Sequence, residues 1–156
     1  ISGTELPGVF TLRTSGSAID ILNWMNTHRI KSAVLIGGGA ISVEIAYLAA
    51  EHGIKITMVE MLEHVLPNAL DPDMSGSLEG YMKEQGIDLR LSERVKEING
   101  DGKVQGVLLA SGEKISTDMV IICAGAEPRN PWQSINRSHP GWESFIFNFQ
   151  FSIFNS

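Results

Sequence analysis

The stretch Ala33–Glu44, AVLIGGGAISVE, decides the fold. It opens with a short apolar run, passes through three glycines and ends with residues typical of a helix. A continuous apolar run is typical of a buried parallel strand. A strand that leads through a glycine turn into a helix is the arrangement that binds dinucleotides. The stretch nearly matches the pattern G-x-G-x-x-G, but Ser42 stands at the third glycine.

The three positions of this pattern have different physical roles. Gly37 permits the sharp turn, and Gly39 lacks the Cβ that would block the approach of a phosphate. The third position lets the helix pack closely on the strand and does not face the phosphates. A small residue is tolerated there, so Ser42 changes the pattern more than the chemistry. The alternative is a tight turn that binds nothing.

An acidic residue follows at the spacing that a dinucleotide site requires. Glu60 ends the next apolar run, 23 residues after Gly37. A carboxylate there accepts hydrogen bonds from the ribose hydroxyls and repels a 2′-phosphate. Met61, Leu62 and Glu63 follow and bring no cation. The sequence therefore predicts a preference for NAD(H) over NADP(H), with a solvated acid at a strand end as the alternative for Glu60.

Helices and strands alternate along the first part of the chain. We expect helices over 14–29, over 40–52 and from Pro72 to about Gln85, with glycines beyond the last two. We expect strands over the apolar runs 31–36, 54–60, 87–91 and 118–124. Two helices are expected to present apolar faces to the core. The residues are Ile41, Ile45 and Leu48 in the second helix, and Met74, Leu78, Tyr81 and Met82 in the third.

The segment after Ser92 has a different pattern. Short strands are expected over 95–98, 104–109 and 113–116, separated by the turn signals Asn99–Gly102 and Ser111–Gly112. Together with the alternation before it, this predicts an α/β fold: a Rossmann-like three-layer domain with a parallel sheet plus a small antiparallel β-meander.

Composition limits the classes of function. The chain has 156 residues, 43% of them hydrophobic, and a formal net charge of −6. An acidic balance argues against a nucleic-acid partner and against a polybasic membrane surface. No run of 18 apolar residues predicts a transmembrane helix, and the start ISGTELPG does not resemble a signal peptide. The single cysteine, Cys123, lies in an apolar run and is expected to be a buried thiol in a cytoplasmic protein.

No constellation of catalytic or metal-binding residues is evident. The histidines stand far apart, at His28, His52, His64 and His139. Nucleophile elbows, zinc-helix patterns and a P-loop lysine are absent from the sequence. We expect no metal site and no catalytic residue in this chain.

The end of the chain differs in composition from the rest. Residues 131–156 are rich in Phe, Asn and Ser, and phenylalanines alternate from Phe145 to Phe151. One interpretation is an amphipathic strand with an aromatic face, and the other is a segment foreign to the domain. We therefore expect a domain over 1–130, with an N-terminal crossover segment over 1–14, followed by this tail.

The chain resembles the central NAD(H)-binding domain of the FAD-dependent pyridine nucleotide-disulfide oxidoreductases. The segments that carry the resemblance are PGVFTLRT (7–14), AVLIGG through DPDM (33–74) and GKVQGV through EPRN (102–130). The similarity extends from about Leu6 to Asn130, and the branch it most resembles is that of the NADH oxidases and coenzyme A-disulfide reductases.

The resemblance implies a set of binding residues. It places the pyrophosphate along the turn and the start of the helix, the nicotinamide beside the helix and a later turn, and the adenosine beside the second strand and the meander. In that order the residues are Gly37, Gly38, Gly39, Ala40 and Ile41; Glu44, Ala124 and Gly125; and Glu60, Met61 and Val95. The family often has an aromatic residue at the position of Ala40, where it shields the flavin, so gating by that residue is in doubt.

The resemblance also implies parts that this chain lacks. In the family, NADH reduces an FAD that is held by a separate domain with its own glycine motif and catalytic cysteine. Neither that motif nor a cysteine at the matching position occurs here. We therefore expect NAD(H) to bind this domain, and we expect FAD to bind only the parent enzyme. The fragment alone is not expected to turn over.

Three hypotheses about function remain open at this stage. The chain is the NAD(H)-binding domain of a flavoenzyme, a stand-alone NAD(H)-binding regulatory module, or an inert truncated fragment. The partner in the first case is the missing FAD-binding domain. A homodimer formed through the Phe-rich residues 145–154 is a further expectation, because removal of a docked domain exposes an apolar patch that needs cover.

Overall fold

The computed structural model describes residues 1–12 and 15–123. They form one compact unit of the chain. Ala124, Gly125 and the tail over 131–156 lie outside the described residues, so the expectations about them stay predictions. In the part of the chain that is described, no helix is long and apolar enough to cross a membrane.

A five-stranded parallel sheet forms the middle layer, in the order β1-β8-β2-β3-β4. Its strands in chain order are β1 (Val9–Thr11), β2 (Ser32–Ile36), β3 (Lys55–Val59), β4 (Asp88–Arg90) and β8 (Met119–Ile122). The last strand of the chain pairs with both β1 and β2. The middle of the sheet is therefore built from segments far apart in the sequence.

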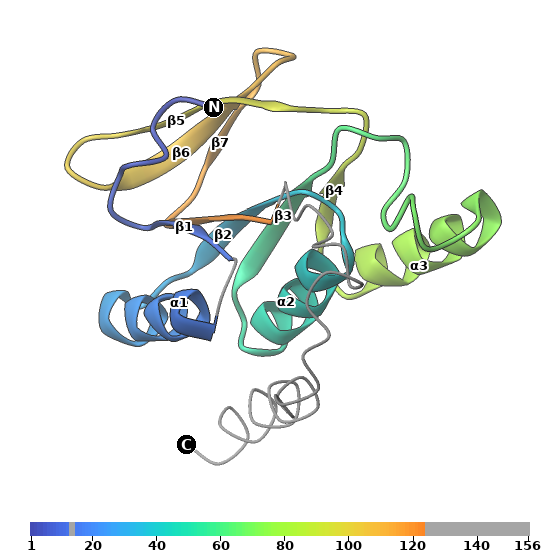
Figure 1. The fold of residues 1–156 in the computed structure, drawn as a ribbon, viewed down its shortest axis with the longest axis horizontal. Coiled ribbons are helices and arrows are strands. Elements are labelled where there is room, and N and C mark those ends of the chain that lie inside the picture. Colours follow the sequence, from blue (N-terminus) through green and yellow to red (C-terminus); the bar gives the residue numbers. More distant parts are fainter. Residues whose placement is uncertain (13–14, 124–156) are drawn as a thin grey trace, which may run out of the picture. The chain divides into compact units, whose positions relative to one another are not determined.

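Helices cover one face of this sheet and a second sheet covers the other (Figure 1). The helices are α1 (Ser15–His28), α2 (Ala40–Glu51) and α3 (Pro72–Glu84). The second sheet is antiparallel and consists of β5 (Val95–Gly100), β6 (Val104–Leu109) and β7 (Lys114–Ser116). The predicted α/β three-layer fold with a small antiparallel meander is thus confirmed.

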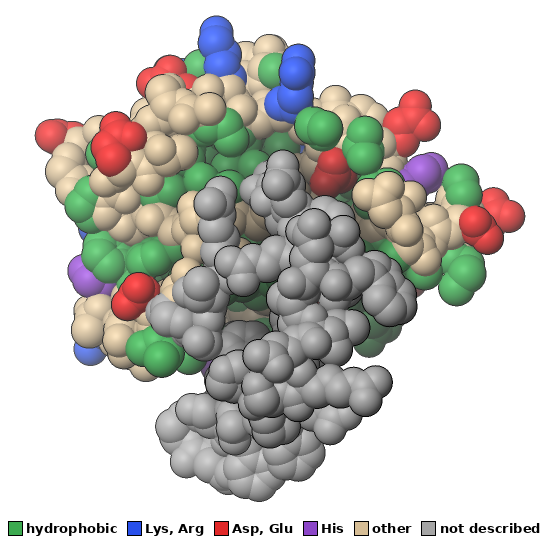
Figure 2. Space-filling view, in the orientation of Figure 1, with side chains coloured by type: hydrophobic (Ala, Val, Ile, Leu, Met, Phe, Trp, Pro, Cys, Tyr) green, Lys and Arg blue, Asp and Glu red, His purple; other side chains and the backbone are tan. Residues whose placement is uncertain are grey.

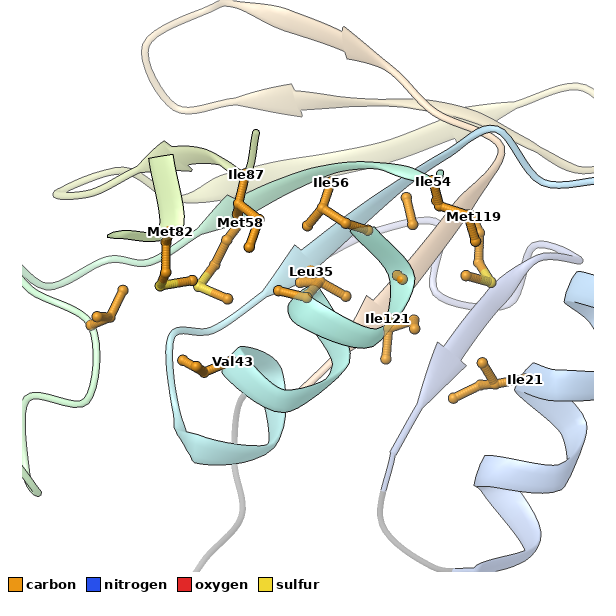
Figure 3. Close-up of a cluster of buried hydrophobic side chains, with 14 residues drawn as sticks. Ile21, Leu35, Val43, Ile54, Ile56, Met58, Met82, Ile87, Met119 and Ile121 are labelled. Atoms are coloured by element: carbon orange, nitrogen blue, oxygen red, sulfur yellow. The ribbon is translucent and has the colours of Figure 1, made fainter. Parts of the chain in front are cut away.

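Successive side chains of β2 belong to two different cores, because side chains alternate across a strand. Ala33 and Leu35 lie in the core under the helices, whereas Val34 and Ile36 lie in the core between the two sheets. Figure 3 shows the first core, in which Leu35 lies among side chains from β3, β8 and all three helices. Burial on both faces explains why this strand reads as a continuous apolar run.

The N-terminal segment contains a strand that the sequence did not predict. We expected only a crossover segment over 1–14, but Val9–Thr11 pairs in parallel with β8 as the edge of the sheet. Three residues are too few to show a strand periodicity. The strand is recognisable only through the partner that arrives more than a hundred residues later.

The predicted inner face of α2 is wrong in part. Its buried residues are Ser42, Val43, Ala46 and Ala49. Ile45 packs against the core, but Leu48 is only half-buried and Ile41 is 47% exposed. The glycine turn brings the helix close to the sheet, so small residues occupy the contact and the larger aliphatic residues flank it.

The predicted inner face of α3 is also wrong in part. Met82 is buried and Leu78 packs against the core, but Met74 and Tyr81 are exposed. The buried face instead carries Ser75, Glu79 and Met82. Apolar periodicity alone cannot find this face, because two of its three residues are polar.

Candidate functional site

The glycine turn lies where β2 ends and α2 begins, at the carboxyl edge of the parallel sheet. Gly37 has a φ of +107°, a conformation that side-chain-bearing residues rarely adopt. Its N–H donates to the Val59 carbonyl at 2.8 Å, which ties the turn to the neighbouring strand β3. Gly37 therefore has the role that the sequence predicted for it, that of permitting the sharp turn.

Gly38 is buried and bonded through both of its backbone groups. Its N–H donates to Glu60 Oε2 at 2.5 Å, and its carbonyl accepts from the Leu66 N–H at 2.8 Å. A Cβ at this position would lie 3.1 Å from Glu60 Oε2, closer than ordinary van der Waals contact. Gly38 is thus a glycine because the Glu60 side chain lies against it, a requirement the sequence pattern does not reveal.

Gly39 has the opposite environment. A Cβ built on it meets no atom of the described residues within 4 Å, and the residue is the N-cap of α2. The amides of Ala40, Ile41 and Ser42 form the first helical turn, where a helix offers no acceptor. That turn carries no acidic residue. Within residues 1–12 and 15–123, open space lies beside these unpaired N–H groups and the positive helix end, an arrangement that fits the diphosphate of a dinucleotide.

Glu60 is held rigidly at the edge of this turn. Its side chain is buried, with the residue only 8% exposed, and Oε1 accepts from the Leu62 N–H at 2.8 Å. Its backbone N–H donates to the Arg90 carbonyl at 2.9 Å. Each carboxylate oxygen has two lone-pair positions and accepts one protein hydrogen bond, so each can still accept one from a ligand hydroxyl.

The other predicted binding residues differ in their exposure to solvent. Met61 follows Glu60 and is 64% exposed, and Glu44 is exposed on the second turn of α2. Val95 opens β5 but lies in the core between the sheets, 6% exposed. The structure therefore brings together Gly37 through Ile41 with Glu60 and Met61. The contact of Val95 with adenine stays a prediction.

Ser42 and Cys123 lie together behind the turn. Ser42 is fully buried, and its hydroxyl has no hydrogen-bond partner among the described residues. Burial raises the pKa of the Cys123 thiol, and the nearby Ser42 hydroxyl opposes this shift without reaching hydrogen-bond geometry. Ser42 thus fills the close helix–strand contact, as the sequence analysis expected, and leaves a polar group unsatisfied there.

A cavity of about 530 Å³ lies beside the segment that follows Glu60. Its lining includes Met61, Leu62, His64, Leu70 and Ser92. The segment is fastened to α3, and sequence reasoning missed the residues that fasten it. No pattern in the sequence marks them, because their contacts join a loop to a helix that follows it.

One buried acid and one buried hydroxyl of α3 bind the segment that follows Glu60. Glu79 Oε1 lies 3.1 Å from the Val65 nitrogen, which donates to it, and 3.1 Å from His64 Nδ1. The Ser75 hydroxyl donates to the Val65 carbonyl at 2.9 Å. These contacts hold the segment that carries Leu66, whose N–H reaches Gly38.

Comparison with known families identifies the chain. A family model described as pyridine nucleotide-disulphide oxidoreductase matches residues 1–140. The chain belongs to the pyridine nucleotide-disulphide oxidoreductase family. Members of this family are flavin-dependent NAD(P)H oxidoreductases, so the family expected from the sequence is confirmed.

Two oxidoreductases illustrate the similarity in sequence. The chain is 37% identical to an NADH oxidase of Methanocaldococcus jannaschii, over 82% of this chain and 28% of that protein. It is 38% identical to a rhodocoxin reductase of Rhodococcus erythropolis, over 82% of this chain and 30% of that protein. The chain thus spans less than a third of the length of these relatives.

Solved structures of oxidoreductases share the fold. A ferredoxin reductase from Rhodopseudomonas palustris superposes with a TM-score of 0.76 at 28% identity, covering 80% of this chain and 31% of that one. A NAD-dependent persulfide reductase from A. fulgidus gives 0.75 at 30% identity, covering 80% of this chain and 23% of that one. These oxidoreductases share the three-layer architecture that carries the glycine turn.

Proposed function

We propose that this chain is the NAD(H)-binding domain of a flavin-dependent oxidoreductase, in which NADH bound here passes a hydride to FAD on a separate domain. The family match supports the class of reaction. The two-electron chemistry belongs to the nicotinamide and the flavin, and this chain contributes binding and orientation.

The observation that carries the proposal is the contrast between Gly38 and Gly39. The first is packed against Glu60, and the second borders space that no other described residue fills, beside the first-turn amides of α2. Hydrogen bonds to Val59, Glu60 and Leu66 fix the turn in this shape before any ligand arrives. In the proposal, the amides of the first helical turn hold the diphosphate, and no rearrangement of the turn is needed.

The same geometry supports a preference for NADH. Glu60 would accept hydrogen bonds from the adenosine ribose, and its charge would repel a 2′-phosphate. Its position is fixed by the N–H groups of Gly38 and Leu62, so it cannot swing away from a phosphate without leaving both groups unpaired. The proposed binding set is completed by Glu44 at the nicotinamide end and Met61 beside the ribose.

Nucleotide titration of the full chain tests the proposal. Quenching of tryptophan fluorescence with energy transfer to the reduced nicotinamide gives the two dissociation constants. We expect NADH to bind at least tenfold more tightly than NADPH. If neither nucleotide binds, the chain is an inert fragment and the proposal is wrong.

Variants at Glu60 test the origin of the preference. Glu60→Gln removes the charge and keeps one oxygen acceptor, and we expect the ratio of NADPH to NADH dissociation constants to fall several-fold. Glu63→Ala is the matched control, since Glu63 is an exposed acid three residues further along. If Glu60→Gln leaves the ratio unchanged, or if Glu63→Ala changes it equally, Glu60 does not select the nucleotide.

A further inference from the structure

Leu66 joins the glycine turn to the segment that follows Glu60. Its N–H donates to the Gly38 carbonyl at 2.8 Å. Its φ of +51° lies in the left-handed region, which residues with a large side chain rarely adopt. Pro67 comes next, and the residue before a proline favours an extended backbone with a negative φ. Such a conformation persists only where surrounding contacts hold it, so the neighbours of Leu66 determine whether its N–H stays directed at Gly38.

Two buried side chains of α3 hold Val65, the residue before Leu66. The Val65 N–H donates to Glu79 Oε1 at 3.1 Å, and the Val65 carbonyl accepts from the Ser75 hydroxyl at 2.9 Å. Val65 and Ser75 are fully buried, and Glu79 is 7% exposed. Side chains of one helix thus fix both polar groups of the Val65 backbone.

The Ser75 contact acts on the same peptide group as the Gly38 contact. The carbonyl of Val65 and the N–H of Leu66 belong to one peptide group, and a peptide group is planar. Because the Ser75 hydroxyl fixes the direction of that carbonyl, it also fixes the direction of the Leu66 N–H. The acceptor belongs to a second planar group, since the Gly38 carbonyl shares its peptide plane with the N–H of Gly39.

These two peptide groups lead to the open side of the glycine turn. Gly39 borders space that no other described residue fills, beside the first-turn amides of α2. Gly38 is held on both sides, at its N–H by Glu60 and at its carbonyl by Leu66. Two hydrogen bonds in series therefore connect the buried Ser75 hydroxyl of α3 with the backbone that is proposed to hold the diphosphate.

We infer that Ser75, supported by Glu79, is a positioning residue for the proposed NAD(H) site. It acts through the peptide before Leu66 on the shape of the glycine turn. The inference rests on the proposed function for the ligand and on the printed hydrogen bonds for the coupling. A turn that is already fixed loses less conformational freedom when a ligand binds, so its affinity is higher. Loss of the Ser75 hydroxyl should therefore weaken NADH binding, although Ser75 is fully buried.

Amide hydrogen exchange of the full, 15N-labelled chain tests the coupling without a nucleotide. Protection of the Leu66 amide is compared with that of the Gly37 amide, which bonds to β3 and not to this segment. We expect the ratio of Leu66 to Gly37 protection to fall about tenfold in Ser75→Ala. Ser77→Ala is the matched control, because Ser77 is exposed and its hydroxyl bonds to a carbonyl of the same helix. An unchanged ratio in Ser75→Ala, or an equal fall in Ser77→Ala, would overturn the inference.

NADH titration tests whether the coupling reaches the nucleotide site. We expect the NADH dissociation constant to rise about fivefold in Ser75→Ala and to change by less than about twofold in Ser77→Ala. Ile21→Val controls for lost stability, because Ile21 is a core residue of α1 with no part in these hydrogen bonds. Its NADH affinity should equal that of the unsubstituted chain. A rise in Ile21→Val as large as that in Ser75→Ala would mean that the effect is one of stability alone.

Variants at Glu79 add a rescue. Glu79→Ala removes the acceptor of the Val65 N–H, whereas Glu79→Gln retains an oxygen acceptor. We expect weaker NADH binding in Glu79→Ala and an affinity within about twofold of the unsubstituted chain in Glu79→Gln. Equal losses in the two variants would show that the contact with Val65 does not support the turn.

The titrations separate this inference from the proposed function. An unsubstituted chain that binds no NADH would overturn the proposed function and, with it, the role of Ser75 toward the nucleotide. An unsubstituted chain that binds NADH no more tightly than Ser75→Ala does would overturn the inference alone.

Discussion

Gly38 and Gly39 are adjacent in sequence, but a side-chain methyl group added at each would have different neighbours. At Gly38 an added Cβ presses on the buried Glu60 side chain, and at Gly39 it meets no described residue. We expect Gly38→Ala to lower the free energy of unfolding by about 1–3 kcal/mol, because Glu60 must move from its hydrogen bonds. Urea unfolding of both variants measures the difference.

Gly39→Ala is the matched variant for this prediction. Its effect on stability should stay within about 0.5 kcal/mol, since a stiffer unfolded chain offsets a weaker N-cap. NADH affinity should nevertheless fall at least tenfold, because the methyl group occupies the space proposed for the diphosphate. Equal losses of stability in the two variants, or unchanged NADH binding by Gly39→Ala, would contradict this account.

Ser42 and Ser75 form a second informative pair. Both are fully buried on helices, but only the Ser75 hydroxyl has a hydrogen-bond partner among the described residues. We expect Ser42→Ala to raise the free energy of unfolding by about 1 kcal/mol and Ser75→Ala to lower it by about 1 kcal/mol. Thermal or urea unfolding checks the two signs. A loss of stability in Ser42→Ala would mean that its hydroxyl is satisfied in solution.

The sequence predicted which residues form the turn, but it did not predict why position 38 must be a glycine. The spacing of Gly37, Gly39 and Glu60 follows from the chemistry of the proposed ligand, so a pattern can reveal it. The need for glycine at position 38 follows from a side chain 22 residues away that lies against it. This need for glycine depends on how the ends of β2 and β3 lie in the folded domain, so a single sequence does not reveal it.

At the scale of elements, α3 fastens the segment that follows Glu60. We expect Glu79→Ala to cost about 2 kcal/mol, because it leaves the buried Val65 N–H without its charged acceptor. His64→Ala should cost less than 1 kcal/mol, since the His64 side chain is 36% exposed. Urea unfolding gives both values. A reversed order would show that the histidine, and not the buried amide, is the main partner of Glu79.

The existence and order of the other elements follow from the sequence, but their faces and one edge strand do not. Apolar runs and glycines located α2 and α3 to within two residues. The inward residues of α2 are small because of the close contact at Ser42 and Ala46, and those of α3 include the hydrogen-bonded Glu79. Periodicity detects apolar residues, so it misses faces that are selected by size or by hydrogen bonding.

At the scale of the whole molecule, acidic and basic side chains are spread over the described surface seen in Figure 2. No single large patch of one charge sign stands out on the described part of this face. The single cysteine can report on unfolding of the whole domain. Cys123 directly follows β8 and packs against the core under the helices, so its thiol becomes fully exposed when the domain unfolds.

Cys123 provides a pH-dependent test of global unfolding. Burial raises its pKa, so the folded chain retains the thiol proton at a pH where the unfolded chain has lost it. Stability should accordingly fall as the pH rises above the ordinary thiol value of about 8.5. At pH 8, a thiol reagent should react slowly with the native chain and rapidly in urea. Equal rates in the two states would show that the thiol is accessible in the fold.

The position of β8 has a consequence for the nascent chain. β2 ends at Ile36 and β8 begins at Met119, 83 residues later, yet β8 lies between β1 and β2. At about 5–20 residues per second, synthesis of that interval lasts roughly 4–17 s. Throughout it, the facing edges of β1 and β2 lack their partner and are open to pairing with other chains. Most of this domain must therefore be synthesised before β8 can pair with β1 and β2 and complete the sheet.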